Sequence, residues 1–192
     1  MASFSALQLT RQLQQLKKNP VDGFSAGLVD DDNVYEWEFT IFGPTDTLYE
    51  EGIFRARMTF PQDFPLNPPK MKFVTEMWHP NIYKNGDVCI SILHAPGVDQ
   101  YGHEDAGERW TPVQSVESIL VSVISLLSAD PPSIESPANI DAAVRLFPLI
   151  SPYMPFPIAH IPSTVQKQVR DDLKGYKKQV RRLVRKSAEE AY

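Results

Sequence analysis

The sequence predicts an α+β domain with an N-terminal helix, a four-stranded antiparallel meander, a central helix and C-terminal helices. The chain begins and ends with amphipathic helical patterns, and a helical pattern with a wide apolar face stands between them. Four short strand patterns follow the first helix, and their connections are too short for crossover helices, so neighbouring strands are expected to run antiparallel. The 192 residues, 42% of them hydrophobic, suit one domain over residues 1–192.

The elements before the centre of the chain follow from the spacing of apolar residues. A helix is predicted over residues 3–18, where Asn19-Pro20 ends the pattern. Its apolar residues recur at spacings of three and four: Ala6, Leu9, Leu13 and Leu16. Strands are predicted where apolar and polar residues alternate, over residues 25–30 (a weaker pattern), 34–42, 53–60 and 70–75.

Three helices are predicted in the second half. The central one has six apolar residues on one face: Val116, Ile119, Leu120, Val123, Ile124 and Leu127. Ser136-Pro137 is typical of the N-cap and first position of another helix, which we expect to reach Ala143. The last helix is indicated by Val169, Leu173, Tyr176, Val180 and Leu183.

Two segments interrupt this order. Residues 95–109 form a polar, acidic loop. Residues 144–166 are apolar but rich in proline, so we expect neither a regular helix nor a paired strand there. Three interpretations of this insertion stay open: a mobile loop, a docking segment for a partner, and retained non-coding sequence that the fold tolerates. Since the cysteine region is complete before it, we expect its removal to leave chemistry and stability intact.

Composition excludes several classes of function. The net charge is -5, whereas a bulk nucleic-acid binder is usually basic. No segment resembles a secretion signal or a membrane span. A single cysteine cannot form an internal disulfide, which favours a reducing compartment: the cytoplasm, with the nucleus as an alternative. Basic residues do gather late, where we expect a solvated helix face: Lys174, Lys177, Lys178, Arg181, Arg182, Arg185 and Lys186.

Cys89 is the candidate for chemistry. It follows the turn sequence Asn85-Gly86-Asp87 and stands eight residues after Asn81. A thiol is a good acyl carrier because its thioester stays reactive toward amines. No base is obvious beside Cys89 in the sequence, and an exchange of thioesters needs less activation than hydrolysis. The alternative is that Cys89 is simply a small buried hydrophobe.

His79-Pro80-Asn81 precedes the cysteine. The carboxamide of Asn81 can donate a hydrogen bond to the oxyanion that forms when an amine attacks a thioester. Asn81 can also simply hold a turn, and the two roles are compatible. His79, between Trp78 and Pro80, is expected to make structural hydrogen bonds.

The sequence resembles the ubiquitin-conjugating enzymes, whose signature matches His79-Pro80-Asn81 followed by Cys89. Further pieces fall in the family's order and spacing: Ser25-Ala26-Gly27, Gly43-Pro44, Leu48-Tyr49-Glu50-Glu51-Gly52, Phe60-Pro61, Pro65, Pro68-Pro69-Lys70, Trp110-Thr111-Pro112 and Ser136-Pro137-Ala138-Asn139. Residues 86–94 followed by an acidic insertion resemble the G subfamily, of the G1 type. The resemblance covers about residues 5–143 and 167–190, and residues 144–166 have no counterpart in it.

The resemblance implies the UBC fold and a transferase. Cys89 would accept ubiquitin from the activating enzyme as a thioester, and Asn81 would support attack by a substrate or ubiquitin lysine. Helix and loop residues would bind the activating enzyme and RING-type ligases: Gln8, Arg11, Leu66, Pro112 and Val113. No metal or cofactor is implied, because ATP is used upstream by the activating enzyme.

The group that orients the incoming lysine differs from the family pattern. Where many members have a carboxylate, this chain has Ser136, with Glu135 beside it. The acidic loop could supply the carboxylate instead, through residues Asp99, Glu104, Asp105 and Glu108, next to His103. Salt would screen such an attraction.

Two other functions are compatible with parts of the sequence. One is a non-catalytic ubiquitin-binding variant of the fold, but those variants lack the cysteine that Cys89 supplies. The other is a cysteine hydrolase that pairs Cys89 with His94 or His79. The hydrolase predicts peptide cleavage and no thioester from the activating enzyme.

Overall fold

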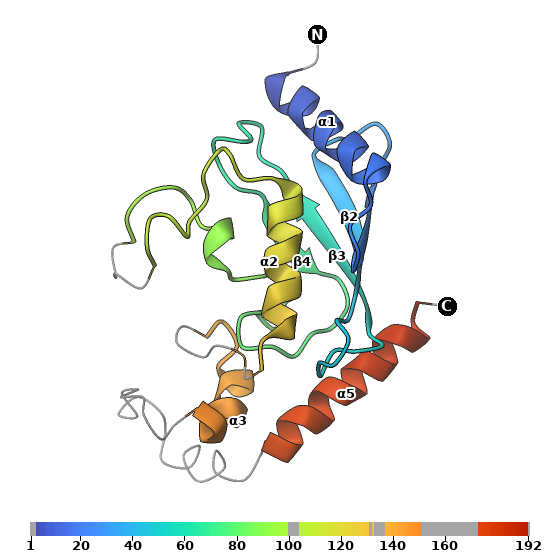
Figure 1. Cartoon of the computed structure of the whole chain (residues 1–192), viewed down its shortest axis with the longest axis vertical. Coiled ribbons are helices and arrows are strands. Elements are labelled where there is room, and N and C mark those ends of the chain that lie inside the picture. Colours follow the sequence, from blue (N-terminus) through green and yellow to red (C-terminus); the bar gives the residue numbers. More distant parts are fainter. Residues whose placement is uncertain (1–2, 100–103, 131, 133–136, 151–172, 192) are drawn as a thin grey trace.

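The computed structural model describes residues 3–99, 104–130, 132, 137–150 and 173–191. One sheet forms the centre, with helix α1 at one end and helices α3 and α5 toward the other (Figure 1). Helix α2 runs across the sheet. This arrangement confirms the predicted α+β class.

Helix α1, Phe4–Lys18, forms as predicted. The Ser3 hydroxyl accepts a hydrogen bond from the Ala6 N–H at 3.1 Å and caps the first turn. Leu9, Leu13 and Leu16 lie on one face because they are three and four residues apart, and all three are buried. The helix packs against β1 on that face.

The four strands form an antiparallel sheet in the order β1-β2-β3-β4, which confirms the meander. Their bounds are Phe24–Leu28, Glu36–Phe42, Ile53–Thr59 and Lys70–Phe73. In β2 and β3 the buried residues stand opposite one another as pairs: Trp37 with Met58, Phe39 with Ala56, and Ile41 with Phe54. One face is therefore covered by the core while the other is polar.

Helix α2, Val116–Ser128, begins at a capping box. The Ser118 N–H donates to the Ser115 hydroxyl and the Ser115 N–H donates to the Ser118 hydroxyl. The apolar face predicted from the sequence is buried through five residues: Val116, Ile119, Leu120, Val123 and Leu127. This helix supplies the apolar surface that the sheet needs on its inner side.

Helix α3 corrects one prediction about a helix start. It spans Ile140–Ile150, and the Asn139 carboxamide oxygen accepts from the Ala142 N–H at 3.2 Å. Asn139, and not Ser136, therefore caps the helix; Ser136 lies outside the described residues. Asn139 is as good a capping residue as serine, and its backbone N–H also donates to the Pro80 carbonyl at 2.7 Å. This second contact selects it.

The prediction that residues 144–166 form no regular helix is wrong for the first part of the segment, because α3 continues to Ile150. Pro148 lies in the last turn, where it removes one helical hydrogen bond and does not break the rest. Ala142, Ala143 and Leu146 are buried, and α3 packs on α5. Tertiary packing thus outweighs the local cost of proline. The remainder, 151–166, lies outside the described residues.

Helix α5, Leu173–Glu189, packs against β3 and α3. Its buried face holds Tyr176, Val180 and Leu183, as predicted, while Val169 lies outside the described residues. The basic residues lie on the other face and are mostly exposed, which confirms the predicted solvated face. Within the described part of the chain, no helix is long and apolar enough to cross a membrane.

Candidate active site

His79 lies beneath the site and is fully buried. Its Nδ1 accepts a hydrogen bond from the Asn81 N–H at 3.0 Å, so this nitrogen carries no proton. Burial lowers the pKa of His79 to about 4, because the charged imidazolium is poorly solvated there. At neutral pH the ring is uncharged and shapes the turn, which agrees with the structural role predicted for it.

Cys89 is fixed beside the turn by backbone hydrogen bonds. The Cys89 N–H donates to the Asn81 carbonyl at 2.9 Å, and Val88 forms a bridge with Ile82. Gly86, with a φ of +93°, makes the preceding turn possible. A side chain at this position would collide with the Phe73 carbonyl, so only glycine fits. The cysteine is partly exposed and free. It is therefore accessible on a rigid base.

Asn81 and Asn139 come from segments that touch at Pro80. Among the described residues, the buried Asn81 Oδ1 and Asn139 Nδ2 have no hydrogen-bond partner. An unpaired buried polar atom is costly, and such atoms gather at functional sites. The structure thus places Asn81 at the cysteine, while the role of its carboxamide stays a prediction.

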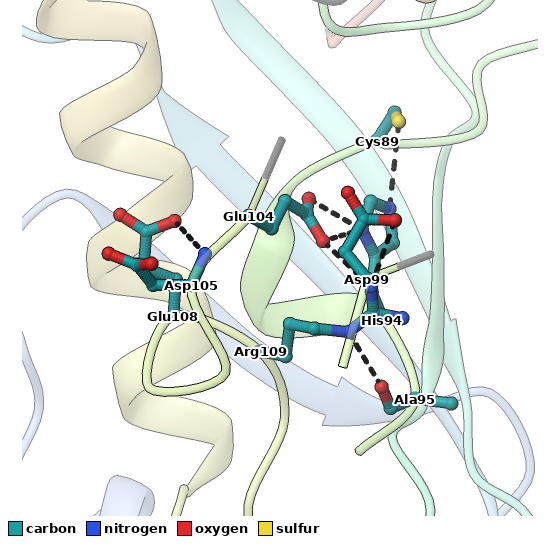
Figure 2. Close-up of polar contacts among 8 residues, drawn as sticks. All are labelled: Cys89, His94, Ala95, Asp99, Glu104, Asp105, Glu108 and Arg109. Carbon is teal, nitrogen blue, oxygen red and sulfur yellow. Dashed lines mark hydrogen bonds and ion pairs between the residues drawn. The ribbon is translucent and has the colours of Figure 1, made fainter. Parts of the chain in front are cut away.

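The structure places a histidine beside Cys89, where the sequence suggested no base. His94 Nε2 lies 3.7 Å from Cys89 Sγ (Figure 2). The 3₁₀ turn η1, Ser91–Leu93, brings them together because it folds the chain back within five residues. The sequence named this pair only for the hydrolase alternative, because a short apolar run does not predict such a turn.

A carboxylate holds the far side of the His94 ring. Glu104 Oε1 and Oε2 lie 2.7 and 2.9 Å from His94 Nδ1, and Arg109 Nη1 lies 3.2 Å from Glu104 Oε2. Burial opposes ionisation of Glu104, but hydrogen bonds from His94 and Ser91 and the nearby charge of Arg109 outweigh it, so the pKa of Glu104 is lowered. Glu104 is therefore an ionised acceptor at neutral pH.

The thiol of Cys89 is protonated at rest. Burial raises the pKa of Cys89; a hydrogen bond from the Tyr83 hydroxyl lowers it in part, and the negative charge of Glu104 raises it again. A high thiol pKa makes a thiolate less available and a poorer leaving group. A free thiolate is therefore scarce at Cys89 at neutral pH.

The acidic loop divides its carboxylates into two sets. Asp99 and Glu104 turn inward, with side chains 12% and 17% exposed, and both face Arg109. Asp105 and Glu108 are exposed and point away from Cys89 (Figure 2). The sequence did not separate these sets. His103 lies outside the described residues, as do Glu135 and Ser136 near the lysine-orienting position.

The residues predicted to bind partners lie on three segments that hydrogen bonds connect. The Ser5 hydroxyl donates to the Gln62 carbonyl, the Val116 N–H donates to the Gln12 carboxamide, and the Trp110 indole donates to the Pro65 carbonyl. Gln8 is partly exposed. The other four predicted residues are exposed: Arg11, Leu66, Pro112 and Val113. The sequence missed Phe4 and Leu7, two further exposed apolar residues of α1.

The geometry alone is compatible with two reaction classes. A cysteine beside an imidazole that a third polar group orients is the arrangement of cysteine hydrolases, and an accessible thiol also suits an acyl carrier. Within the described residues, no group of histidine, cysteine or acidic side chains could hold a metal ion. The geometry therefore does not decide between transfer and hydrolysis.

Comparison with known proteins decides it. Residues 8–148 match the family model described as ubiquitin-conjugating enzyme. Ubiquitin-conjugating enzyme E2 15 of Schizosaccharomyces pombe is 55% identical over 188 residues, covering 98% of each chain. Ubiquitin-conjugating enzyme E2 G2 of Homo sapiens is 53% identical over 143 residues, 74% of this chain and 86% of that one.

A solved structure of human ubiquitin-conjugating enzyme E2 G1 aligns with a TM-score of 0.60 and 58% identity, covering 67% of this chain and 98% of that one. These relatives agree with the predicted likeness to the G subfamily and favour the transferase over the hydrolase. The chain belongs to the ubiquitin-conjugating enzyme family.

Proposed function

We propose that Cys89 accepts ubiquitin from the activating enzyme as a thioester and passes it to a lysine amine of a substrate or of another ubiquitin. The observation that carries this proposal is the partly exposed Cys89, held by its backbone against Asn81. It is the one cysteine in the sequence, so no other residue can form the thioester. The raised thiol pKa suits a carrier that holds its acyl group until an amine arrives.

The test is incubation with ubiquitin, activating enzyme and ATP, followed by a gel without reductant. The wild-type protein forms an adduct that reductant removes. Cys89→Ser forms an adduct that reductant does not remove, because an oxyester resists thiols, and Cys89→Ala forms none. An adduct on Cys89→Ala contradicts the proposal.

Asn81 would support the transfer step. Its carboxamide can donate to the oxyanion that develops on the thioester carbonyl. The backbone contact between Asn81 and Cys89 supports this role, since it keeps the two residues adjacent.

The outward carboxylates of the acidic loop would attract the acceptor. Asp105 and Glu108 are exposed and do not contact His94, and Glu108 also accepts a hydrogen bond from the Asp105 N–H at 3.3 Å, so both carboxylates can meet a lysine or a basic face of an acceptor ubiquitin. The double change Asp105→Asn, Glu108→Gln should slow chain formation at low salt and leave charging intact. Added salt should reduce the difference between variant and wild type, because it screens exposed charges. Equal rates at low salt contradict the role.

The activating enzyme and RING-type ligases would share the surface formed by α1 and the loops around Leu66 and Val113. Leu66 is 63% exposed and Phe4 and Leu7 extend the apolar area on α1. Contiguous exposed apolar side chains mark protein-binding surfaces. The three connecting hydrogen bonds keep this surface rigid, which limits the entropy lost on binding.

A further inference from the structure

We infer that His94, oriented by Glu104, takes the proton from the amine that attacks the thioester on Cys89 and returns it to the departing sulfur. The inference rests on the proposed thioester at Cys89. His94 Nε2 lies 3.7 Å from Cys89 Sγ, and the opposite ring nitrogen lies 2.7 and 2.9 Å from the two oxygens of Glu104 (Figure 2). The three side chains thus form one line of contacts, from Glu104 through His94 to the sulfur of Cys89.

The ring tautomer follows from this line. An ionised carboxylate can only accept hydrogen bonds, so His94 Nδ1 must donate to Glu104. In the neutral ring, Nε2 then carries a lone pair that faces the sulfur. Arg109 keeps Glu104 in place through Nη1, and its Nε donates to the Ala95 carbonyl at 2.9 Å. The far end of the line is therefore anchored in the loop backbone.

The groups around Cys89 leave His94 as the base. The Tyr83 hydroxyl also contacts the sulfur, but a thiolate at Cys89 and burial would both disfavour the phenolate and raise the pKa of Tyr83, so Tyr83 stays protonated at neutral pH. His79 is buried beneath the turn and its Nδ1 is occupied by the Asn81 N–H. Glu104 is occupied by His94 and Arg109. In the described part of the site, only His94 offers a free lone pair to the sulfur.

The transfer step balances with this single proton carrier. The uncharged amine nitrogen of lysine bonds to the thioester carbonyl carbon, and Nε2 of His94 takes a proton from that nitrogen. The C–S bond then breaks, and the imidazolium gives the same proton to Sγ. The products are an amide and the Cys89 thiol, with no net gain or loss of protons.

The surroundings of the sulfur make this proton return useful. Burial and the negative charge of Glu104 both disfavour a thiolate at Cys89. A departing sulfur is therefore a poor leaving group unless it is protonated as it leaves. The same negative charge stabilises the imidazolium that exists between the two proton transfers. Glu104 thus opposes the thiolate and holds the ring that returns the proton.

The experiment measures discharge of pre-charged protein in a single turnover, with free lysine or with hydroxylamine as acceptor. Hydroxylamine is uncharged and strongly nucleophilic at neutral pH, so it has little need of a base. His94→Gln protein that has been pre-charged to the same extent as the wild type is expected to lose about 100-fold in lysine discharge, the size of a general-base contribution. Its hydroxylamine discharge should fall much less, because this acceptor needs no base and loses only the return of a proton to the departing sulfur. Added imidazole should restore part of the lysine rate in His94→Ala.

Glu104 provides a second test through the tautomer. In Glu104→Gln the new amide can donate to Nδ1, which moves the ring proton to Nε2 and removes the lone pair. Lysine discharge should fall, and the double variant with His94→Gln should be no slower than His94→Gln alone. Glu76→Gln is the matched control, because Glu76 pairs with Lys186 on α5 instead of with His94.

Two results would overturn the inference. An equal loss toward lysine and hydroxylamine, without imidazole rescue, would show that His94 only shapes the loop. Unchanged lysine discharge in His94→Gln would show that it has no role in the step. Failure of the wild-type protein to charge at all would instead contradict the proposed thioester, so the two failures are distinguishable.

Discussion

Leu146 connects α3 to the core, and its replacement tests whether the segment after Ala143 belongs to the domain. Its side chain is 1% exposed, whereas Ile140 on the same helix is 66% exposed. Leu146→Ala leaves a cavity, and buried changes of this kind lower the free energy of unfolding by about 2–5 kcal/mol. At roughly 2–4 °C for each kcal/mol in a domain of this size, the melting temperature should fall by roughly 4–20 °C.

The assay is thermal unfolding followed by circular dichroism. Ile140→Ala is the matched control and should change the free energy of unfolding by no more than about 0.5 kcal/mol, as exposed changes usually do. Removal of residues 144–166 takes Leu146 with it and should also destabilise the protein, contrary to the expectation from the sequence. Equal melting temperatures for Leu146→Ala and Ile140→Ala would refute the reasoning.

Three further predictions concern the site and its surface. Asn81→Ala should charge nearly normally and transfer to lysine about 100- to 1000-fold more slowly; equal losses in both steps would indicate a folding role. Leu66→Ala should weaken ligase-stimulated discharge and spare unstimulated discharge, while the exposed control Val74→Ala changes neither; undiminished stimulation across several RING proteins would count against this surface. Burial lowers the pKa of His79 to about 4, so only the unfolded state binds its proton between pH 6.5 and 4, and stability should fall by up to about 3 kcal/mol as the pH falls through this range. Urea unfolding of His79→Asn should show a smaller loss, and an identical pH profile would disprove the assignment.

The regular elements could be predicted because their signals are local. Alternation along Trp37, Phe39 and Ile41 decides which face of a strand is buried, whatever the strand contacts. The same holds for α2, where spacing alone defines the buried face. Cys89 and Asn81 could be named as candidates for a related reason, since a turn sequence and a short spacing place them near one another.

The start of α3 depended on a contact that spacing does not encode. Ser136 and Asn139 are both capable N-caps, and the hydrogen bond from the Asn139 N–H to the Pro80 carbonyl selects the second. Packing of Leu146 against the core then stabilises the helix enough for it to continue past Pro148. Proline does weaken the helix locally, as its propensity predicts. The helix forms nevertheless, because burial of apolar side chains stabilises it by more than the one lost hydrogen bond costs.

The sequence by itself determined the order of the elements, the buried faces of the sheet and helices, and the candidate cysteine. Only the tertiary structure decided which groups surround that cysteine. His94 reaches Cys89 through a single 3₁₀ turn, and Glu104 reaches His94 from across a loop. Hydrogen bonds between loop residues depend on the positions of atoms in space and leave no period in the sequence. Apolar faces do leave such a period, because burial repeats with the geometry of the helix or strand.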